Sequence, residues 1–372
     1  MEDYEKLRDN FVHLARIALS QRPQDVQALL HRVAKQNSND KELSAGLIEL
    51  LRKQPTRSSP LRRSTESAVP VDIDSRFQLL RTEEHPALAH EPIYEESAQK
   101  VLSRLVEERK NVGRLLEAGL EPTRTALFTG PPGVGKTMAA KWMARELGKP
   151  LLVLDLAAVM SSYLGRTGSN LRHVLDYAKS IDCILLLDEL DAIAKRRDDT
   201  GEIGELKRLV TVLLQQLDDW PPSGLLLAAT NHSELLDPAV WRRFEEVVEF
   251  SLPERNAVKA FAGDLLKGAV SEASVWPDAL SIAMAGLSFN DIERAITNVR
   301  RVAAIDGGTL EEHLPQLVRP ERHSKQDMIE LATMLVDSGL VSQRKATELT
   351  GIARETIRTR SGNNVKTRRK RA

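Results

Sequence analysis

The sequence is poor in cysteine, in aromatic residues and in net charge. Cys183 is the single cysteine among 372 residues, which excludes a disulfide within the chain and a zinc site built from several cysteines. Aromatic residues make up only 4% of the chain, so we expect a core of mainly aliphatic side chains. Acidic and basic residues number 53 each, so the overall charge favours neither nucleic acid nor membrane as a partner.

Long apolar runs are also missing. No run approaches the roughly 20 residues that a transmembrane helix requires. The opening residues, MEDYEKLRDN, carry charges of both signs and lack the apolar core of a signal peptide. We therefore expect a cytoplasmic protein that has no membrane partner.

Changes in composition divide the chain into five predicted segments. Residues 1–53 have apolar side chains at helical spacing and predict a small N-terminal helical domain. Residues 54–75 are rich in Pro, Ser, Thr and Arg, which is typical of a flexible linker. A large α/β part is expected over 76–252 and a helical part over 253–320. A helical segment with a basic tail is expected over 321–372.

Five short aliphatic runs alternate with amphipathic stretches between residues 122 and 250. The runs lack the in–out alternation of a half-exposed strand, which is typical of parallel strands buried on both faces. They cover Thr125–Thr129, Leu151–Leu156, Cys183–Leu187, Leu225–Ala229 and Val247–Phe250. The predicted fold class is therefore α/β, with a parallel five-stranded sheet between helices.

The first run leads into GPPGVGKT and then into a helical stretch, which is the context of a phosphate-binding loop. A glycine-rich turn that binds nothing is the alternative, and the strand and helix on either side disfavour it. Backbone N–H groups of such a loop surround phosphates, Lys136 can reach the β- and γ-phosphates, and Thr137 can ligate Mg²⁺. The predicted nucleotide contacts are Gly130, Pro131, Pro132, Gly133, Val134, Gly135, Lys136, Thr137 and Met138.

Two acidic residues follow the third run, at the edge of the sheet where ligands bind in open α/β folds. Asp188 suits a Mg²⁺ contact, and Glu189 suits polarisation of the attacking water. Alternatively, both are solvated acids that open the next helix. Asp191 is interpreted as a first-turn helix acid rather than as a contact to a neighbouring subunit.

These motifs, together with LLLDELDAIAKRR and AATNHSELLDPAVWRRF, resemble the AAA proper clade of the AAA+ ATPases over about residues 90–310. The clade includes katanin- and spastin-like remodellers and membrane-bound AAA proteases. The resemblance implies a P-loop NTPase fold with a helical lid, hydrolysis of ATP with Mg²⁺, and a homohexamer. It implies that Asn231 orients the lytic water as the sensor-1 residue. It also implies that Arg242 and Arg243 are arginine fingers that reach a neighbour's γ-phosphate.

Weaker parts of the same resemblance concern the base and the lid. Ile93 and Tyr94 stand where family members line the adenine. Phe289 and Asn290 replace the small residues that are usual in the lid motif. Trp220 falls in a loop that often signals between subunits, where it either packs across the interface or caps a loop.

The substrate class is predicted from one loop. Tyr163, Leu164 and Gly165 resemble the aromatic–aliphatic–glycine pore loop of family members that thread polypeptides, although Arg166 replaces the usual Glu. The alternative is that Tyr163 and Leu164 are core residues near a turn. Chains of this layout also resemble bacterial AAA ATPases thought to work beside a subtilisin-like serine protease, and this chain has no protease motif of its own.

The carboxyl end indicates a different partner. The segment VSQRKATELTGIARETIRTR resembles a helix-turn-helix, with Gly351 at the turn and Ile352 and Ile357 at packing positions. After Glu355 all charges are basic, which is typical of a phosphate-binding surface, of a protein-docking module or of a solvated tail.

Three functional hypotheses follow. The first is an ATP-driven protein remodeller or unfoldase, with a protease as a possible partner. The second is a nucleic-acid-associated ATPase that binds DNA through its carboxyl end. The third is an adaptor that binds ATP without turnover, which Glu189, Asn231 and the two arginines argue against.

Overall fold

The computed structural model describes Val33 and residues 80–161, 167–192, 203–271 and 273–369. The chain separates into two units, Met1–Ala68 and Val69–Ala372, and the elements below belong to the second. The predicted N-terminal helices and the linker 54–75 lie outside the described residues. Among the described helices, none is both long and apolar enough to span a membrane.

A six-stranded sheet organises the α/β part, in the order β1-β3-β4-β5-β2-β6. Its five parallel strands occupy the five predicted runs to within one residue at each end: β2 (Thr125–Thr129), β3 (Leu151–Asp155), β4 (Ile184–Asp188), β5 (Leu225–Thr230) and β6 (Glu246–Glu249). The predicted parallel sheet is therefore confirmed. The sequence did not predict β1 (Leu80–Glu83), which pairs antiparallel with β3 at the edge.

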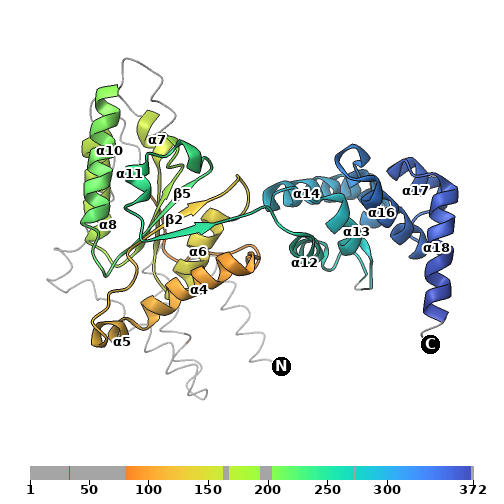
Figure 1. Ribbon diagram of the computed structural model, residues 1–372, viewed down its shortest axis with the longest axis horizontal. Helices are drawn as coiled ribbons and strands as arrows, with labels where there is room; N and C mark the ends of the chain where they lie inside the picture. The colour runs from red at the N-terminus through yellow and green to blue at the C-terminus, as the bar shows by residue number, and fades with distance from the viewer. Residues whose placement is uncertain (1–32, 34–79, 162–166, 193–202, 272, 370–372) are drawn as a thin grey trace. The chain divides into compact units, whose positions relative to one another are not determined.

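Helices cover both faces of the sheet (Figure 1). Side chains from alternate strand positions enter two separate clusters, because successive side chains of a strand point to opposite faces. One cluster holds α4 (Glu96–Lys110) and α6 (Lys136–Leu147) against the sheet. The other holds α7 (Leu156–Ser161), α8 (Thr167–Lys179), α10 (Ile203–Asp218) and α11 (Pro238–Trp241). The short helix α5 (Val112–Glu117) follows α4.

The register brings the polar ends of the central strands to one edge of the sheet. Thr129 of β2 lies opposite Thr230 of β5, and Asp188 of β4 lies opposite Asp155 of β3. Because the strands run parallel, the loops that follow them emerge together. The edge therefore gathers the Gly130 loop, the Asp188-Glu189 pair and Asn231.

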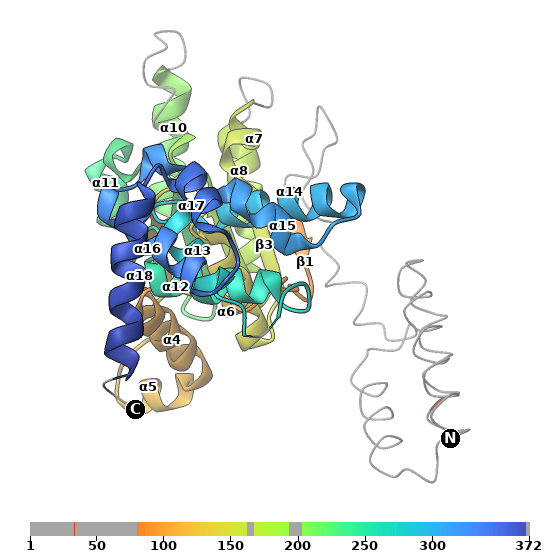
Figure 2. The ribbon, with the colours of Figure 1, turned by 90° about the vertical axis from the view of Figure 1, so that its right-hand side faces the viewer.

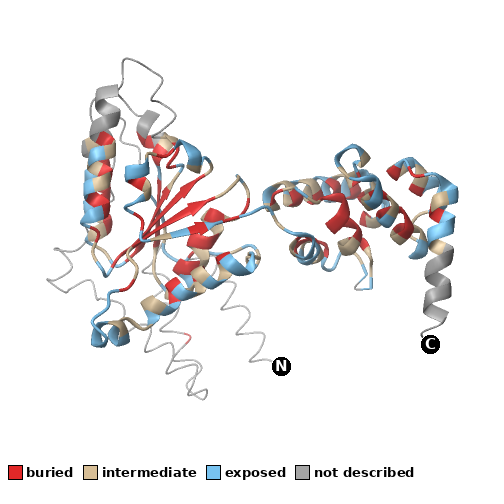
Figure 3. Cartoon of the chain, in the orientation of Figure 1, coloured by how far each residue is buried: buried red, intermediate tan, exposed pale blue. Residues whose placement is uncertain are grey.

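The remainder of the described chain is helical. It comprises α12 (Arg255–Leu266), α13 (Trp276–Ala283), α14 (Phe289–Asp306), α15 (Leu310–His313), α16 (Lys325–Asp337), α17 (Gln343–Thr350) and α18 (Arg354–Arg369), with short 3-10 turns η4 (Leu314–Leu317) and η5 (Pro320–Arg322). Another short turn, η3 (Ser233–Leu235), follows β5 in the α/β part. One apolar cluster runs from α12 through to α18, and the buried faces of these helices point toward it (Figure 3). The lid and the C-terminal helices therefore share one core.

The C-terminal helix is longer than the sequence indicated. Helical structure was predicted to residue 360 with a basic tail beyond it, whereas α18 continues to Arg369. Residues 363–369 contain neither proline nor glycine, so the helix can continue through the basic stretch.

Candidate active site

The loop between β2 and α6 makes a tight turn that only glycine accommodates at its start. Gly130 has a φ of +138°, and a Cβ added there would lie 2.0 Å from the backbone oxygen of Phe250. Gly135 has a φ of +101° and immediately precedes α6. The predicted loop thus ends at a helix N-terminus, where free N–H groups and the helix dipole favour phosphate.

Lys136 projects from the first turn of α6 into the polar end of the sheet. Its Nζ donates to the backbone oxygens of Gly130 (2.6 Å) and Pro131 (2.9 Å) and to Asn231 Oδ1 (2.7 Å). Burial lowers the pKa of Lys136 to about 8, although the carboxylates of Asp188 and Asp191 oppose that shift.

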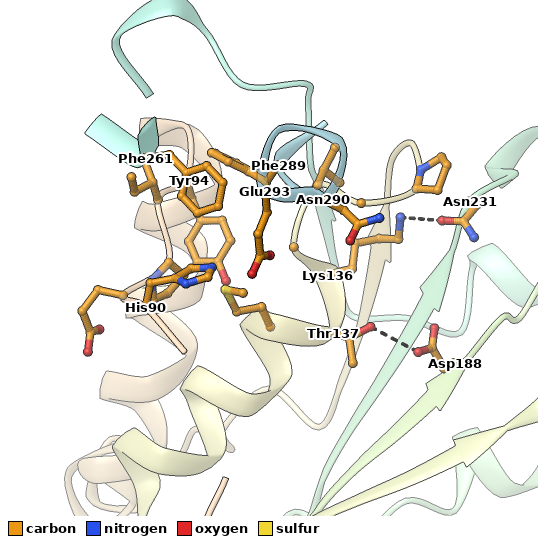
Figure 4. Close-up of a pocket in the computed structure, with 18 of the residues that line it drawn as sticks. His90, Tyr94, Lys136, Thr137, Asp188, Asn231, Phe261, Phe289, Asn290 and Glu293 are labelled. Atoms are coloured by element: carbon orange, nitrogen blue, oxygen red, sulfur yellow. Dashed lines mark hydrogen bonds between the residues drawn. The ribbon is translucent and has the colours of Figure 1, made fainter. Parts of the chain in front are cut away.

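Thr137 and Asp188 face each other across the loop and the strand end (Figure 4). Thr137 Oγ1 donates to Asp188 Oδ2 at 3.2 Å. A hydroxyl and a carboxylate are the hard oxygen ligands that Mg²⁺ prefers, and Mg²⁺ in nucleotide sites takes only one or two protein ligands besides phosphate and water. Among the described residues, no cluster of three or more His, Cys, Asp or Glu side chains could hold a metal ion. The pair fits Mg²⁺.

Glu189 has an unusual backbone conformation. It is the one non-glycine residue of the described chain with a positive φ, at 56°, and its N–H donates to Asp188 Oδ1 at 3.0 Å. A side chain in this left-handed region costs on the order of 1–3 kcal/mol, and such strain concentrates at functional sites. The turn brings Glu189 to the cavity wall directly beside Asp188.

Asp191 is buried and is 3% exposed. Its Oδ1 accepts from Thr230 Oγ1 at 3.1 Å and from the N–H of Asn231 at 3.2 Å. The sequence interpretation as a first-turn acid missed this role, because the partners lie about 40 residues further along the chain. Asp191 therefore fixes the end of β5 from which the Asn231 side chain reaches Lys136.

A cavity of about 400 Å³ connects these groups to the helical lid. Its polar end is formed by residues 132–138 with Asp188, Glu189 and Asn231. The rest of its lining is formed by His90, Glu91, Pro92, Ile93, Tyr94, Phe261, Phe289, Asn290 and Glu293. The mixed polar and aromatic lining suits a ligand that carries both phosphates and an aromatic base.

The predicted base-side residues Ile93 and Tyr94 both line this cavity. Burial raises the pKa of the Tyr94 hydroxyl far above its usual range, so the group stays neutral. Sequence reasoning missed His90 and Phe261, whose rings lie edge to face at 5.0 Å. Phe289 meets the other side of Phe261, also at 5.0 Å. No local pattern could have found a cluster assembled from such distant parts of the chain.

The lid touches the phosphate loop directly. The N–H of Asn290 donates to the backbone oxygen of Gly133 at 3.2 Å. A Cβ added at Gly133 would lie 2.6 Å from Ser288 Oγ and 2.9 Å from Asn290 Cβ. The first turn of α14 therefore rests on the loop, and Glu293, one turn further along α14, lines the cavity.

Arg242 and Arg243 do not line the cavity. Both are exposed at the end of α11, whose start is capped by the Asp237 carboxylate accepting from the N–H of Ala239 at 2.8 Å. Arg243 Nη1 lies 2.6 Å from Asp218 Oδ1, whereas Arg242 makes no ion pair with another described residue.

Two other predictions concern residues around this edge. The pore-loop residues Tyr163, Leu164 and Gly165 lie outside the described residues. Trp220 is 1% exposed and belongs to the core beside α8 and α10, with Lys179 Nζ 5.7 Å from its ring centre. The alternative in which Trp220 packs across a subunit interface is therefore wrong.

Comparisons with known proteins agree with this geometry. Residues 126–252 match the family model described as ATPase family associated with various cellular activities (AAA). The chain is 35% identical over 288 residues to an uncharacterized AAA family ATPase, y4kL, of Sinorhizobium fredii, covering 77% of this chain and 86% of the relative.

More distant relatives match over a shorter span. The ATP-dependent zinc metalloprotease FtsH 3 of Sphaerobacter thermophilus is 31% identical, covering 61% of this chain and 49% of the relative. The proteasome-activating nucleotidase of Aeropyrum pernix is 29% identical, covering 61% of this chain and 58% of the relative. The chain thus spans about half the length of these two relatives.

Among solved structures, the AAA domain of FIGL-1 in complex with ADP has a similar fold. The TM-score is 0.51 at 23% sequence identity, covering 62% of this chain and 77% of that one. At this level of identity, the likeness supports the fold alone.

Proposed function

The chain belongs to the AAA family of ATPases, and from that premise we propose that it is a homohexamer that couples Mg²⁺-dependent ATP hydrolysis to the remodelling or unfolding of polypeptides. The observation that carries the proposal is the convergence of Lys136, Thr137, Asp188 and Asn231 at one end of a single cavity. The lid closes the other end of that cavity, which leaves room for a nucleotide between them.

The five polar side chains nearest the phosphate loop and the strand ends each have a distinct part in hydrolysis. The Lys136 ammonium binds the β- and γ-phosphate oxygens, and Thr137 and Asp188 hold Mg²⁺. When bound there, Mg²⁺ offsets the negative charge that develops on the transferred phosphoryl group. The Glu189 carboxylate accepts a proton from the attacking water, and the Asn231 amide orients that water.

The two arginines complete the site of a neighbouring subunit. They are exposed and lie away from the cavity of their own subunit, and a guanidinium binds phosphate oxygens without losing its charge. Arginine fingers contribute factors of about 10³–10⁵ in phosphoryl transfer. Hydrolysis therefore depends on assembly of the ring. Arg242 has no ion pair with a described residue, so it can bind the neighbour's phosphate without breaking one. Arg243 would first have to break its ion pair with Asp218.

The substrate class is proposed from two lines of support. Similar proteins are named for work on other proteins, as the FtsH metalloprotease and the proteasome-activating nucleotidase are. In addition, Tyr163, Leu164 and Gly165 resemble a pore loop that grips an extended chain. Any cleavage would be supplied by a partner, for which we propose a subtilisin-like serine protease. The residues 2–53 would recruit the substrate or this partner.

The hydrolytic assignment is tested with two variants. Lys136→Ala should abolish nucleotide binding, measured by isothermal titration calorimetry. Glu189→Gln should bind ATP as the wild type does, lose turnover and accumulate as an ATP-bound oligomer, measured by phosphate release and size-exclusion chromatography. Persistent ATP turnover in Glu189→Gln would contradict the assignment of Glu189 as the base that accepts a proton from the attacking water.

Polypeptide remodelling is tested separately. An unfolded polypeptide should stimulate the wild-type ATPase. Tyr163→Ala should retain basal turnover but lose both this stimulation and the unfolding of a fluorescent substrate. Tyr163→Phe, which keeps the aromatic ring, is the matched control and should behave as the wild type does. Normal unfolding by Tyr163→Ala would rule out threading through this loop.

A further inference from the structure

The helices α16, α17 and α18 form a compact three-helix unit far from the phosphate loop in sequence (Figure 2). Ser342 caps α17 by accepting from the N–H of Lys345 at 3.2 Å, and Gly351 ends it with a left-handed φ of 71°. Only three residues, 351–353, join α17 to α18. A short turn that contains glycine between two helices is the arrangement of a helix-turn-helix.

Buried side chains fix how the two helices cross. Ala346 and Ile357 are fully buried, and Ile352 and Thr350 are nearly so. They pack against Leu331 and other apolar residues of α16 in the lid core. Both α17 and α18 are therefore anchored to the lid core by buried side chains. The sequence prediction of a helix-turn-helix-like segment is confirmed at the level of these elements.

The outer surface of α18 is basic. Arg354, Arg358 and Arg360 are exposed, and none makes an ion pair with another described residue. Glu355 is the single acid of α18, and every charge that follows it in the sequence is basic: Arg358, Arg360, Lys366, Arg368, Arg369, Lys370 and Arg371. Two acids of α16, Asp327 and Glu330, bind Arg255 of α12. The third, Asp337, accepts a hydrogen bond from the hydroxyl of Ser361 on α18. The positive charge is thus concentrated on one element.

The same surface lacks the apolar anchors of a protein interface. The exposed large hydrophobic residues of the described chain are Leu116, Leu120, Leu235, Val247, Leu252 and Ile305, and none belongs to α16, α17 or α18. Protein interfaces typically place aromatic or aliphatic side chains at their centre and exclude charge from it. In Figure 3 the described outer turns of α18 are exposed, in line with a polar ligand.

We propose that α17 and α18 bind double-stranded DNA, with α18 in the major groove. The groove is roughly 12 Å wide and admits an α-helix of about 10–12 Å diameter, whereas the major groove of A-form RNA is too narrow. Arg354, at the N-terminus of α18, would reach the edge of a guanine, and Glu355 would accept from a cytosine amino group. Arg358 and Arg360 would bind backbone phosphates. This activity is separate from the ATP cavity.

Binding is measured with the full-length protein by fluorescence anisotropy, using a 30-base-pair duplex of mixed sequence, the matching single strand and a duplex RNA. The wild type should prefer duplex DNA, and its affinity should fall steeply between 50 and 200 mM NaCl. Arg354→Gln/Arg358→Gln/Arg360→Gln should weaken duplex binding by about 10–100-fold at 100 mM NaCl and make the salt dependence shallower. Its basal ATP turnover should remain unchanged.

A matched control removes the same charge elsewhere on the helical part. Arg300, Arg301 and Arg319 are also exposed, and their replacement by Gln should leave duplex affinity within about twofold of wild type. An equal loss in this control would mean that general charge, not α18, attracts the duplex. Truncation after Ser361 removes the end of α18 together with the basic residues that follow it. If this truncation abolishes binding while the triple arginine variant binds normally, the proposal is overturned. Failure of the wild type to bind duplex DNA, or a preference for RNA, would also overturn it.

Discussion

At the scale of single residues, the site is unusual for the lowered pKa of the Lys136 ammonium. Its ammonium is buried and is satisfied by three oxygen atoms of the chain itself, two of them backbone carbonyls. Burial is the largest influence on its pKa, which lies near 8. Phosphate oxygens of a nucleotide carry full negative charge and stabilise the ammonium better than carbonyls do. Nucleotide binding should therefore raise the pKa of Lys136.

This shift predicts how nucleotide affinity depends on pH. Below pH 8 the free protein already carries the proton on Lys136, so affinity should be nearly constant. Above pH 8 binding must take up a proton, and each further pH unit should weaken ATP affinity by up to about tenfold. Calorimetry at pH 7, 8 and 9, in buffers with different ionisation enthalpies, measures both the affinity and the proton uptake.

The control for this prediction is Lys136→Arg, because the guanidinium stays charged throughout this range. Whatever affinity that variant retains should be flat between pH 7 and 9. An unchanged or rising wild-type affinity from pH 8 to 9 would contradict the assignment of this proton to Lys136.

At the scale of elements, the contact between α14 and the phosphate loop links the lid to the sheet. The link passes through Gly133, which has a φ of +78° that side chains rarely adopt. Its close neighbours Ser288 and Asn290 also leave no room for a side chain. A nucleotide in the cavity would touch the loop and α14 together. A movement of the lid would therefore change the contacts between the phosphate loop and the nucleotide phosphates.

Replacing Gly133 by alanine should weaken ATP binding by about tenfold or more. The new methyl group must push Ser288 and Asn290 away from the loop, and overpacking of this kind costs roughly 1–3 kcal/mol. The matched control is Gly268→Ala, since Gly268 has nearly the same φ, +76°, with nothing within 4 Å of its added Cβ. Comparable losses of ATP affinity in the two variants, measured by calorimetry, would show that backbone strain and not the lid contact is responsible.

The sequence predicted correctly those elements whose pattern lies within one continuous stretch of residues. The strands β2 to β6 are aliphatic runs, and the phosphate loop has its residues in one stretch, so both were found. The strand β1 was missed, because the four residues LRTE owe their pairing to β3 rather than to any apolar pattern of their own. Asp191 and Phe261 were also missed, since their roles depend on partners far away in the sequence.

At the scale of the whole molecule, the hydrolytic site proposed above is divided between two surfaces of the subunit. The cavity holds the nucleotide contacts, whereas Arg242 and Arg243 are exposed outside it. Two different patches that meet in this way make a head-to-tail interface, which generates a ring when the rotation closes. Subunits with different defects should then be able to repair each other.

Mixing Lys136→Ala with Arg242→Ala/Arg243→Ala should restore ATP turnover that neither variant has alone. In a random equal mixture, about a quarter of the interfaces pair an intact loop with intact arginines. Mixing Lys136→Ala with Glu189→Gln is the control and should restore nothing, because both defects lie in the same half-site. If the first mixture is also inactive in a phosphate-release assay, while mixed oligomers are detected by native mass spectrometry, the arginines do not act between subunits.

The two outermost strands of the sheet have a consequence for a protein that handles extended polypeptides. An open sheet edge is a template onto which a foreign strand can be added, and such captures are hard to reverse. Here each outer strand, β1 and β6, is only four residues long and carries charged side chains, and Arg104 of α4 reaches across to Glu246 of β6. If the chain acts on extended polypeptides, as proposed, a substrate would meet only short, charged edge strands, which disfavour strand addition and so favour its release.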